Sequence, residues 1–591
     1  MKVADYIFEY LTRKGVEKIF MISGGQAMYL VDAVCKNRKI EAICTHHEQA
    51  AAMAAEAYGR ITGKIGVALV TAGPGSVNTI TGLVGGWTDS SPMMIVSGQS
   101  NVDCVKYQQA SGIRQYGIQG INIKPFVESG TKFFVTIDDP AKTLFYISKA
   151  YTLATTGRPG PVWVDVPLDI QKMEVPESLQ QEYQNPLISF HDTDGQIAEV
   201  AERILMAVRP IFLLGQGVRI SNSIEILNKL IGRLKMPVLT SRLGIDIIAS
   251  DSPYYVGRPG NYGERSANFA IQAADLVIAV GCRLASALVG HNPKDFARNA
   301  EIIVVDIDEK ELNKPGVAID VKIHCDCNYF LTKLHEYSIG RQMPDFSGWV
   351  KRCRDWRVRY PVALPEYKEE TPVNSYYFSD RLSELSDEKD MVLVDTGTCF
   401  HVVCQTWKIK KGQRFLTTGG LSSMGYWAAG IGACLANNKQ NTIVVTGDGS
   451  LQMNIQEFAT IRHNNLPIKV FIFNNNGYLL IRHTQSNFME GRLFAEGPET
   501  GVWCPDSLKI AEAYGIKGVR ISHVEEVDEK IKEVLDYEGP VICDVMTPEW
   551  QLIIPRISSE KLPDGTLVSK PYDDMFPFLS RAEYALNRMM E

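Results

Sequence analysis

Short apolar runs that end in glycine or proline alternate with helix-forming segments along most of the chain. Examples are KIGVALVTAG, PMMIVSG and PVWVDVP, then PIFLLGQG, LVIAVG and EIIVVDID, and later MVLVDTGT, NTIVVTGDGS and GPVICDVM. Such alternation favours parallel sheets covered by helices. Because a single hydrophobic core stops growing well below 591 residues, the chain must divide into several domains. We therefore predict an α/β protein with three doubly wound parallel-sheet domains.

Polar, proline-containing stretches without periodicity mark the domain boundaries. They lie around residues 174–195 and 340–372. We expect a first domain over 1–175, a middle domain over 190–340 and a third domain over 370–550. Residues 551–591 are rich in proline and aromatic side chains and are expected to form a C-terminal tail lying over another surface.

Composition excludes several classes of protein. The 61 basic and 68 acidic side chains give a net charge of −7, which argues against nucleic acid as a partner. No run of 18 apolar residues is present, so no membrane span is expected, and the charged first 20 residues predict an amphipathic helix and not a signal peptide. Twelve irregularly spaced cysteines are typical of a cytoplasmic enzyme with reduced thiols.

The most informative segment runs from NTIVVTGDGS to IKVFIFNNNG. Two strands end there, one at Asp448 and the other at Asn475 and Gly477, and a helix is expected to begin at about Leu451. The carboxyl ends of parallel strands lie at one edge of a sheet, so these residues should converge. Mg²⁺ prefers a few protein oxygens plus phosphates and water. The Asp448 carboxylate, the Asn475 amide oxygen and the Gly477 carbonyl therefore predict a magnesium site.

The GDGS motif followed by NNNG resembles the diphosphate-binding motif of thiamine diphosphate enzymes. A tight glycine turn is the alternative for GDG alone. The segment from ICTHHEQAAAMAAEAYG to PMMIVSGQ resembles the pyrimidine-binding domain of the acetolactate synthase, pyruvate oxidase and decarboxylase superfamily. The resemblance implies thiamine diphosphate with Mg²⁺ and makes Glu48 the catalytic carboxylate that bonds the pyrimidine ring. Taken alone, Glu48 also suits a helix N-terminus.

The same resemblance implies further contacts and an assembly. Met424 would hold the cofactor bent, although a core methionine is the alternative, and His46 and His47 are either structural or proton carriers. The pyrimidine domain of one subunit would face the diphosphate domain of another, in a homodimer or homotetramer with active sites between chains. The other implied cofactor contacts are Gly24, Gly25, Pro74, Asn78, Thr398, Cys399, Gly447, Gly449, Ser450 and Tyr478.

The chain is most similar to the acetolactate synthase branch. Gln119 matches a catalytic-pocket glutamine, and Lys132 matches a pocket lysine or is a solvated charge. Where the branch has an arginine and a tryptophan for the second keto acid, this chain has Ala287 and Thr484, near Ile481. Without the guanidinium and indole groups, a carboxylate acceptor loses its anchor. We expect a roomier pocket and a different acceptor.

The expected reaction is decarboxylation of pyruvate or another small 2-keto acid, followed by transfer of the acyl unit to a carbonyl acceptor such as a nucleotide-linked keto-sugar. Acetolactate synthase, FAD-dependent pyruvate oxidase and a non-catalytic cofactor-binding paralogue remain alternatives. The middle domain resembles the superfamily's FAD-binding domain, but that domain also persists without flavin in decarboxylases, so FAD stays open. The residues concerned are Gly215, Gly217, Arg283 and Asp306.

Overall fold

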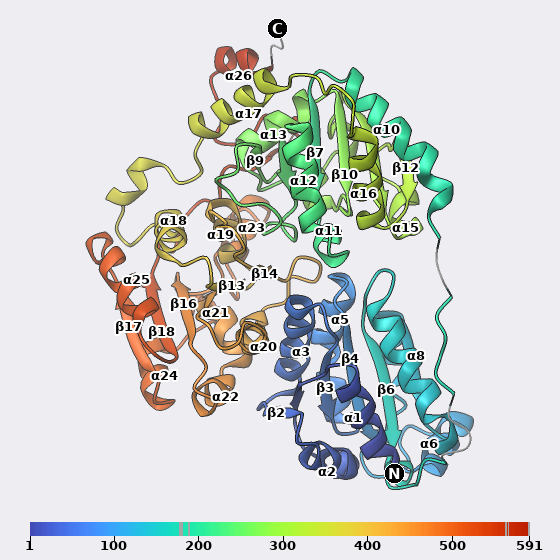
Figure 1. The fold of residues 1–591 in the computed structure, drawn as a ribbon. Helices are drawn as coiled ribbons and strands as arrows, with labels where there is room; N and C mark the ends of the chain where they lie inside the picture. The colour runs from blue at the N-terminus through green and yellow to red at the C-terminus, as the bar shows by residue number, and fades with distance from the viewer. Residues whose placement is uncertain (177–180, 187–188, 562–563, 565, 589–591) are drawn as a thin grey trace.

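The computed structural model describes residues 1–176, 181–186, 189–561, 564 and 566–588. Three sheets follow one another along the chain, each with six parallel strands and helices on both faces (Figure 1). This confirms the predicted α/β class with three parallel-sheet domains. All the apolar runs named above form strands.

The first sheet has the order β2-β1-β3-β4-β6-β5. One face packs on α3 through Phe20, Ala68 and Ile95, while the neighbouring residues Ile19 and Met94 pack on the other face with α1 and α8. Covered on both faces, its central strands are continuous apolar runs. The elements are α1 Val3–Arg13, β1 Lys18–Met21, α2 Met28–Lys36, β2 Glu41–Cys44, α3 Glu48–Thr62, β3 Gly66–Val70, α4 Pro74–Asn78, α5 Ile80–Thr88, β4 Met93–Gln99, α6 Val102–Ser111, α7 Lys124–Val127, β5 Phe133–Thr136, α8 Thr143–Thr155, β6 Val162–Pro167 and α9 Leu168–Gln171.

The middle sheet has the order β12-β11-β10-β7-β8-β9. Its elements are α10 Asp194–Met206, β7 Pro210–Leu214, α11 Gly217–Ile220, α12 Ile224–Leu234, β8 Val238–Thr240, β9 Tyr255–Gly257, α13 Arg265–Ala273, β10 Leu276–Val280, α14 Ser286–Val289, β11 Glu301–Asp306, α15 Glu309–Asn313, β12 Val321–His324, α16 Cys327–Ser338 and α17 Ser347–Arg359. Helix α17 lies inside the stretch 340–372 that was expected to join two domains. It packs on α13 because Trp349, Cys353 and Trp356 recur on one helical face and are buried.

The third sheet has the order β14-β13-β15-β16-β18-β17. The elements are α18 Ser375–Leu385, β13 Met391–Val394, α19 Thr398–Thr406, β14 Phe415–Thr417, α20 Gly430–Ala436, β15 Thr442–Gly447, α21 Asp448–Leu451, α22 Glu457–His463, β16 Ile468–Asn474, α23 Leu479–Phe488, α24 Ser507–Ala513, β17 Lys517–Ile521, α25 Val527–Asp536 and β18 Val541–Met546. The helix expected at about Leu451 instead begins at Asp448, directly after the strand, and ends at Leu451. Asp448 thereby lies in the first turn, where the helix dipole favours an acidic side chain.

Residues that follow the third domain lie over the middle domain (Figure 1). Arg265 donates to the Pro577 carbonyl at 2.6 Å, Asn268 donates to the Tyr572 carbonyl at 2.9 Å, and the Trp356 indole donates to Asn587 at 2.9 Å. The tail contains a two-stranded sheet and one helix, β19 Ser559–Lys561, β20 Leu567–Ser569 and α26 Arg581–Arg588.

The first and third domains share one hydrophobic core. Helix α3 packs so closely on α20 that a Cβ on Gly432 would lie 1.9 Å from the Ala54 carbonyl oxygen. Beside this contact, the buried Arg60 lies between Glu56 and Asp89, and the Tyr426 hydroxyl donates to Glu56. The first and third domains are therefore held together within one chain.

Candidate functional site

Asp448 and Asn475 converge at the carboxyl edge of the third sheet. Strands β15 and β16 are adjacent and parallel, with Gly447 opposite Phe473. The Asp448 carboxylate accepts the backbone N–H groups of Gly449 and Gly477, both at 2.9 Å. Burial raises the pKa of Asp448 to about 6, although these two hydrogen bonds act in the opposite direction.

The oxygen atoms at this edge fit a magnesium ion bound to a diphosphate. The Asn475 side chain is 5% exposed, and its Oδ1 has no hydrogen-bond partner among the described residues. A buried amide oxygen without a partner costs free energy, which a cation would recover. Gly477 adopts φ 133°, a value suited to glycine, and places its N–H on Asp448. The Tyr478 ring lies against Gly449, and a Cβ on Gly447 would meet no atom within 4 Å, which leaves the backbone there open to a ligand.

A second carboxylate, Asp395, organises the loops around this edge. It is fully buried and accepts hydrogen bonds from Ser450 Oγ at 2.6 Å, Thr446 Oγ1 at 2.9 Å and the Thr396 N–H at 2.7 Å. Ser450 Oγ in turn accepts the N–H of Gly425, the residue after Met424. Asp395 was missed in the sequence, where its place at the end of VLVDTG was the available signal.

The predicted diphosphate contacts Thr398 and Cys399 form the first turn of α19. The Cys399 thiol donates to the Thr396 carbonyl at 2.9 Å, and burial raises its pKa well above the ordinary value. The thiol is therefore turned toward its own backbone. The groups of this turn that can bind a phosphate are the backbone N–H groups at the start of the helix. Met424 is partly buried, on the loop that precedes Gly425.

The residues predicted in the first domain gather at the carboxyl edge of its sheet. Glu48 begins α3, and its Oε2 accepts a 3.0 Å hydrogen bond from the Asn78 amide at the end of α4, the helix that Pro74 begins. A Cβ on Gly73, which has φ 64°, would lie 2.7 Å from the Gln119 carbonyl oxygen. Gly24, in the loop after β1, packs on Thr71, and Gly25 follows it. Glu48, Pro74, Asn78 and Gln119 are thus brought together.

His46 and His47 have structural partners. The His47 ring accepts the Gln49 N–H at 3.1 Å and caps α3, and His46 Nδ1 lies 3.1 Å from Thr460 Oγ1. Gln49 also accepts from Asn454 at 3.2 Å. Within the described residues, however, no hydrogen bond or ion pair joins Glu48 to Asp448 or Asn475.

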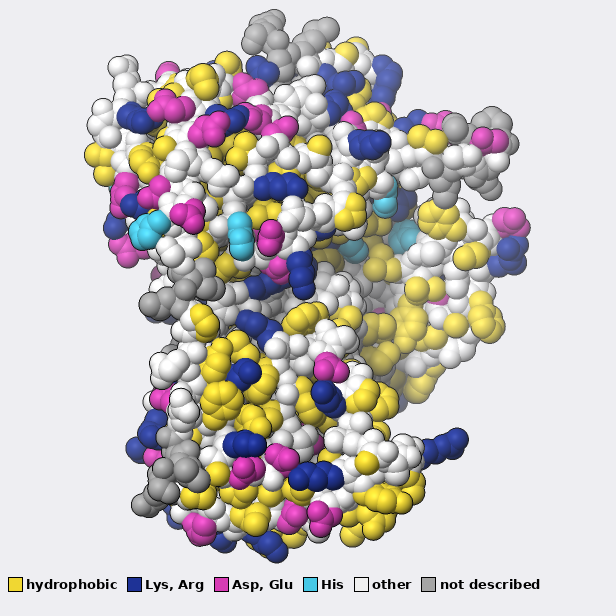
Figure 2. All heavy atoms as spheres, turned by 90° about the vertical axis from the view of Figure 1, so that its right-hand side faces the viewer, with side chains coloured by type: hydrophobic (Ala, Val, Ile, Leu, Met, Phe, Trp, Pro, Cys, Tyr) yellow, Lys and Arg dark blue, Asp and Glu magenta, His cyan; other side chains and the backbone are white. Residues whose placement is uncertain are grey.

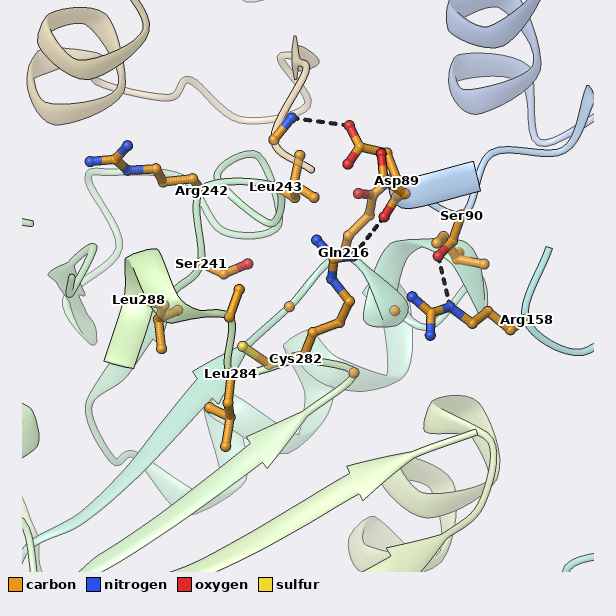
Figure 3. A pocket seen from close by; sticks show the side chains of 18 of the residues that line it. Asp89, Ser90, Arg158, Gln216, Ser241, Arg242, Leu243, Cys282, Leu284 and Leu288 are labelled. Carbon is orange, nitrogen blue, oxygen red and sulfur yellow. Dashed lines mark hydrogen bonds between the residues drawn. The ribbon is translucent and has the colours of Figure 1, made fainter. Parts of the chain in front are cut away.

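A cavity of about 630 Å³ lies where the three domains meet. Figure 2 shows the molecule hollowed between the middle domain and the first domain, with basic side chains around the hollow. Gly215, Gly217, Arg283 and Asp306 all line the cavity. Gly215 and Gly217 pack on the Gly281 backbone, and Arg283 donates to the Thr88 carbonyl at 2.6 Å. The four residues that resemble those of an FAD-binding domain therefore line one cavity, and Figure 3 shows part of its wall.

The predicted substrate-pocket residues are dispersed. Ala287 lines the cavity on α14. Lys132 does not, because its ammonium group donates to the Thr156 and Arg158 carbonyls at 2.8 and 2.7 Å. Ile481 and Thr484 are exposed on α23, and from that helix it is Leu480 that lines the cavity. No helix in the described part of the chain is both long and apolar enough to cross a bilayer.

Comparison with known proteins agrees with this geometry. The thiamine pyrophosphate enzyme models match residues 1–125 for the N-terminal TPP binding domain, 197–334 for the central domain and 395–545 for the C-terminal TPP binding domain. The probable acetolactate synthase large subunit of Methanocaldococcus jannaschii is 32% identical over 560 residues, which cover 92% of each chain. The acetolactate synthase large subunit of Lactococcus lactis is 30% identical over 94% of each chain, and isozyme 2 of Escherichia coli is 30% identical over 95% of this chain and 99% of its own. The chain therefore belongs to the thiamine pyrophosphate enzymes, in the branch of the acetolactate synthase large subunits.

Proposed function

We propose that this enzyme decarboxylates pyruvate or another small 2-keto acid with thiamine diphosphate and Mg²⁺, and transfers the acyl unit to a carbonyl acceptor. The observation that carries the proposal is the buried Asn475 Oδ1, which lies beside Asp448 and has no hydrogen-bond partner in the described part of the chain, since a magnesium diphosphate would satisfy both groups. The names of the relatives, all acetolactate synthases, support acyl transfer as the reaction class.

In this proposal Asp448, Asn475 and Gly477 hold the metal, and the helix N-terminus at Thr398 binds the diphosphate. Bound thiamine diphosphate supplies an electron sink for the electrons released when the 2-keto acid loses CO₂. Glu48 holds a proton at a ring nitrogen of the cofactor. Asn78 orients Oε2 of this carboxylate, and Gly75 leaves Oε1 accessible, because a Cβ there would lie 3.6 Å from it.

We further propose that two copies of the chain complete each site, in a homodimer or homotetramer. Among the described residues, Glu48 forms no hydrogen bond or ion pair with Asp448 or Asn475 of its own chain, which supports this assembly. Large apolar side chains are exposed in the segments that follow both clusters or adjoin them in sequence, with Ile118 at 76% and Phe126 at 57% in the segment of Gln119, and Phe494 at 74% and Trp503 at 72% after Gly477. Exposed apolar surface of this kind is typical of an interface. The irregularly spaced free cysteines support a cytoplasmic location.

Two candidate functions differ in the molecule that accepts the acyl unit. The replacement at Ala287, which lines the cavity, and the size of the cavity favour an acceptor bigger than a keto acid, such as a nucleotide-linked keto-sugar. The printed names of the relatives favour acetolactate synthase, in which pyruvate is also the acceptor. Gly215, Gly217 and Arg283 line the same cavity and support FAD as a further cofactor, bound in the middle domain. If FAD takes part in the reaction, the enzyme is a pyruvate oxidase.

Product analysis tests the proposal. The protein is incubated with pyruvate, Mg²⁺, thiamine diphosphate and a panel of aldehydes, 2-keto acids and nucleotide-linked keto-sugars. The products are identified by mass spectrometry. Asp448→Asn is the matched inactive control. A mass equal to acceptor plus pyruvate minus CO₂ supports carboligation. Acetolactate alone supports the second candidate, and pyruvate-dependent bleaching of a yellow protein supports the oxidase. Absence of CO₂ release under all conditions contradicts the proposal and favours a non-catalytic paralogue.

A further inference from the structure

Arg242 and His401 form a contact pair on the wall of the cavity. Arg242 follows β8 of the middle domain and His401 lies in the first turn of α19, so the pair bridges two domains. Arg242 Nη1 lies 3.1 Å from His401 Nδ1, and Nη2 donates to the Tyr262 carbonyl at 2.8 Å. The guanidinium lies 4.7 Å from the centre of the Phe400 ring. Aromatic stacking and two hydrogen bonds therefore fix one orientation of the guanidinium.

The charge of Arg242 has no counter-ion among the described residues. Arg158 lines the same cavity, but it is paired with Asp308 at 2.8 Å and with Glu311 at 2.9 Å. Burial lowers the pKa of Arg242, and the nearby Arg258 acts in the same direction. A partly buried cation without a partner costs free energy that an anionic ligand would recover.

His401 adds a second donor to the same wall. Because an arginine N–H only donates, His401 Nδ1 must be the acceptor, and the proton of the neutral ring sits on Nε2. Burial and the charge of Arg242 lower the pKa of His401 well below its ordinary value, which keeps the ring neutral. The ring is held against Tyr262, with centroids 4.2 Å apart. The pair thus offers N–H groups and one positive charge, and no acceptor.

Backbone hydrogen bonds of two adjacent residues connect Arg242 to Ala287. Tyr262, whose carbonyl accepts from Arg242, follows Asn261, and the Asn261 N–H donates to the Ala287 carbonyl at 2.9 Å. Arg242 and Ala287 therefore line the same cavity and are connected through two adjacent residues, and Ala287 is the position where the related synthases are expected to have an arginine. We propose that Arg242, oriented by His401 and Phe400, anchors an anionic group of the acceptor, a carboxylate or a phosphate. The inference rests on the proposed carboligation and names the chemistry of its acceptor.

The two sources of such an anion are a 2-keto acid and the diphosphate of a nucleotide-linked sugar. Acceptor KM is measured for 2-ketobutyrate, for a nucleotide-linked keto-sugar and for neutral benzaldehyde, at saturating pyruvate. Arg242→Gln should raise the KM of the anionic acceptor by about 10- to 100-fold, as expected for loss of hydrogen bonds to a charged group. Arg242→Lys should recover part of this loss because it keeps the charge without the planar fork. The KM of benzaldehyde and CO₂ release from pyruvate should stay unchanged.

The matched control is Arg158→Gln, which removes a cavity charge that is already paired and should leave every acceptor KM unchanged. Equal KM values in wild type and Arg242→Gln for all anionic acceptors would overturn the proposal. So would an equal rise for benzaldehyde, since this would indicate a distorted pocket.

Calorimetric titration of the full chain with UDP and with 2-ketobutyrate separates this inference from the proposed reaction. Weaker binding of either anion to Arg242→Gln than to wild type supports the anchor even if no CO₂ is released. Unchanged binding of both contradicts the anchor whatever the activity. The ligand whose affinity falls identifies the source of the anion.

Discussion

The backbone N–H of Gly477 donates a 2.9 Å hydrogen bond to Oδ2 of Asp448, across the gap between two neighbouring strands. This bond ties the loop after β16 to the turn after β15, so that Asn475 is held beside the carboxylate. Burial raises the pKa of Asp448 to about 6, so the ionised carboxylate is costly without a nearby positive charge. The arrangement is one that a divalent cation stabilises.

Asn475→Ala should weaken Mg²⁺ binding in the presence of thiamine diphosphate. The variant removes the buried Oδ1, for which the residues that the structure describes supply no hydrogen-bond partner. We expect a loss larger than the roughly 10- to 100-fold that removal of a residue supporting a metal ligand costs. Asn476→Ala is the control, because its amide donates to Glu549 at the surface. Titration calorimetry measures both, and equal affinities for the two variants would exclude Asn475 as a ligand.

Asp165 should make stability depend on pH. It is buried within β6, where its carboxylate accepts a hydrogen bond from Ser97 Oγ at 2.6 Å, and burial raises its pKa from 3.8 to about 7. A raised folded-state pKa gives stability that is full below about 3.8 and is lost as pH rises to about 7. Between these limits the slope is on the order of 1.4 kcal/mol per pH unit. Asp165→Asn should flatten the fall of Tm between pH 5 and 7, and an unchanged slope would contradict the assignment.

Arg60→Met should destabilise the contact between the first and third domains. Arg60 lies 3.3 Å from Glu56 and 3.6 Å from Asp89, and the three side chains are at most 6% exposed. Removing the cation leaves two buried carboxylates uncompensated, at a cost of about 3–5 kcal/mol. Lys36→Met breaks an exposed pair with Asp32 and should change the stability far less, because water and salt screen the pair. Urea unfolding compares the variants, and similar midpoints would show that the buried cluster contributes little.

The sheets and the edge of the third sheet could be predicted from the sequence because both follow from local rules. Strand β10 is buried on both faces and is an unbroken apolar run, and parallel strands must bring Asp448 and Asn475 to one edge. The apolar spacing of α17 was also available in the sequence but is short and lies among charged residues.

The side-chain contacts of Arg242, His401 and Lys132 could not be predicted in the same way. Arg242 and His401 meet from different domains, through loop geometry that no local pattern encodes. Lys132 matches a pocket lysine in the sequence, yet its orientation depends on two carbonyls of a later loop. Contacts between distant loops depend on how the domains pack, which the periodicity of the sequence does not specify.

The exchange of the C2 proton of bound thiamine diphosphate with solvent deuterium tests the central claim most directly. In the wild type with Mg²⁺ we predict exchange much faster than for the free cofactor, because Glu48 is placed to hold the proton of the pyrimidine ring. Glu48→Gln keeps a side chain that Asn78 can still bond, and should slow exchange by about 100-fold or more, the scale of a lost proton-transfer group. Exchange in the wild type no faster than in solution, or equally fast in Glu48→Gln, would contradict the account.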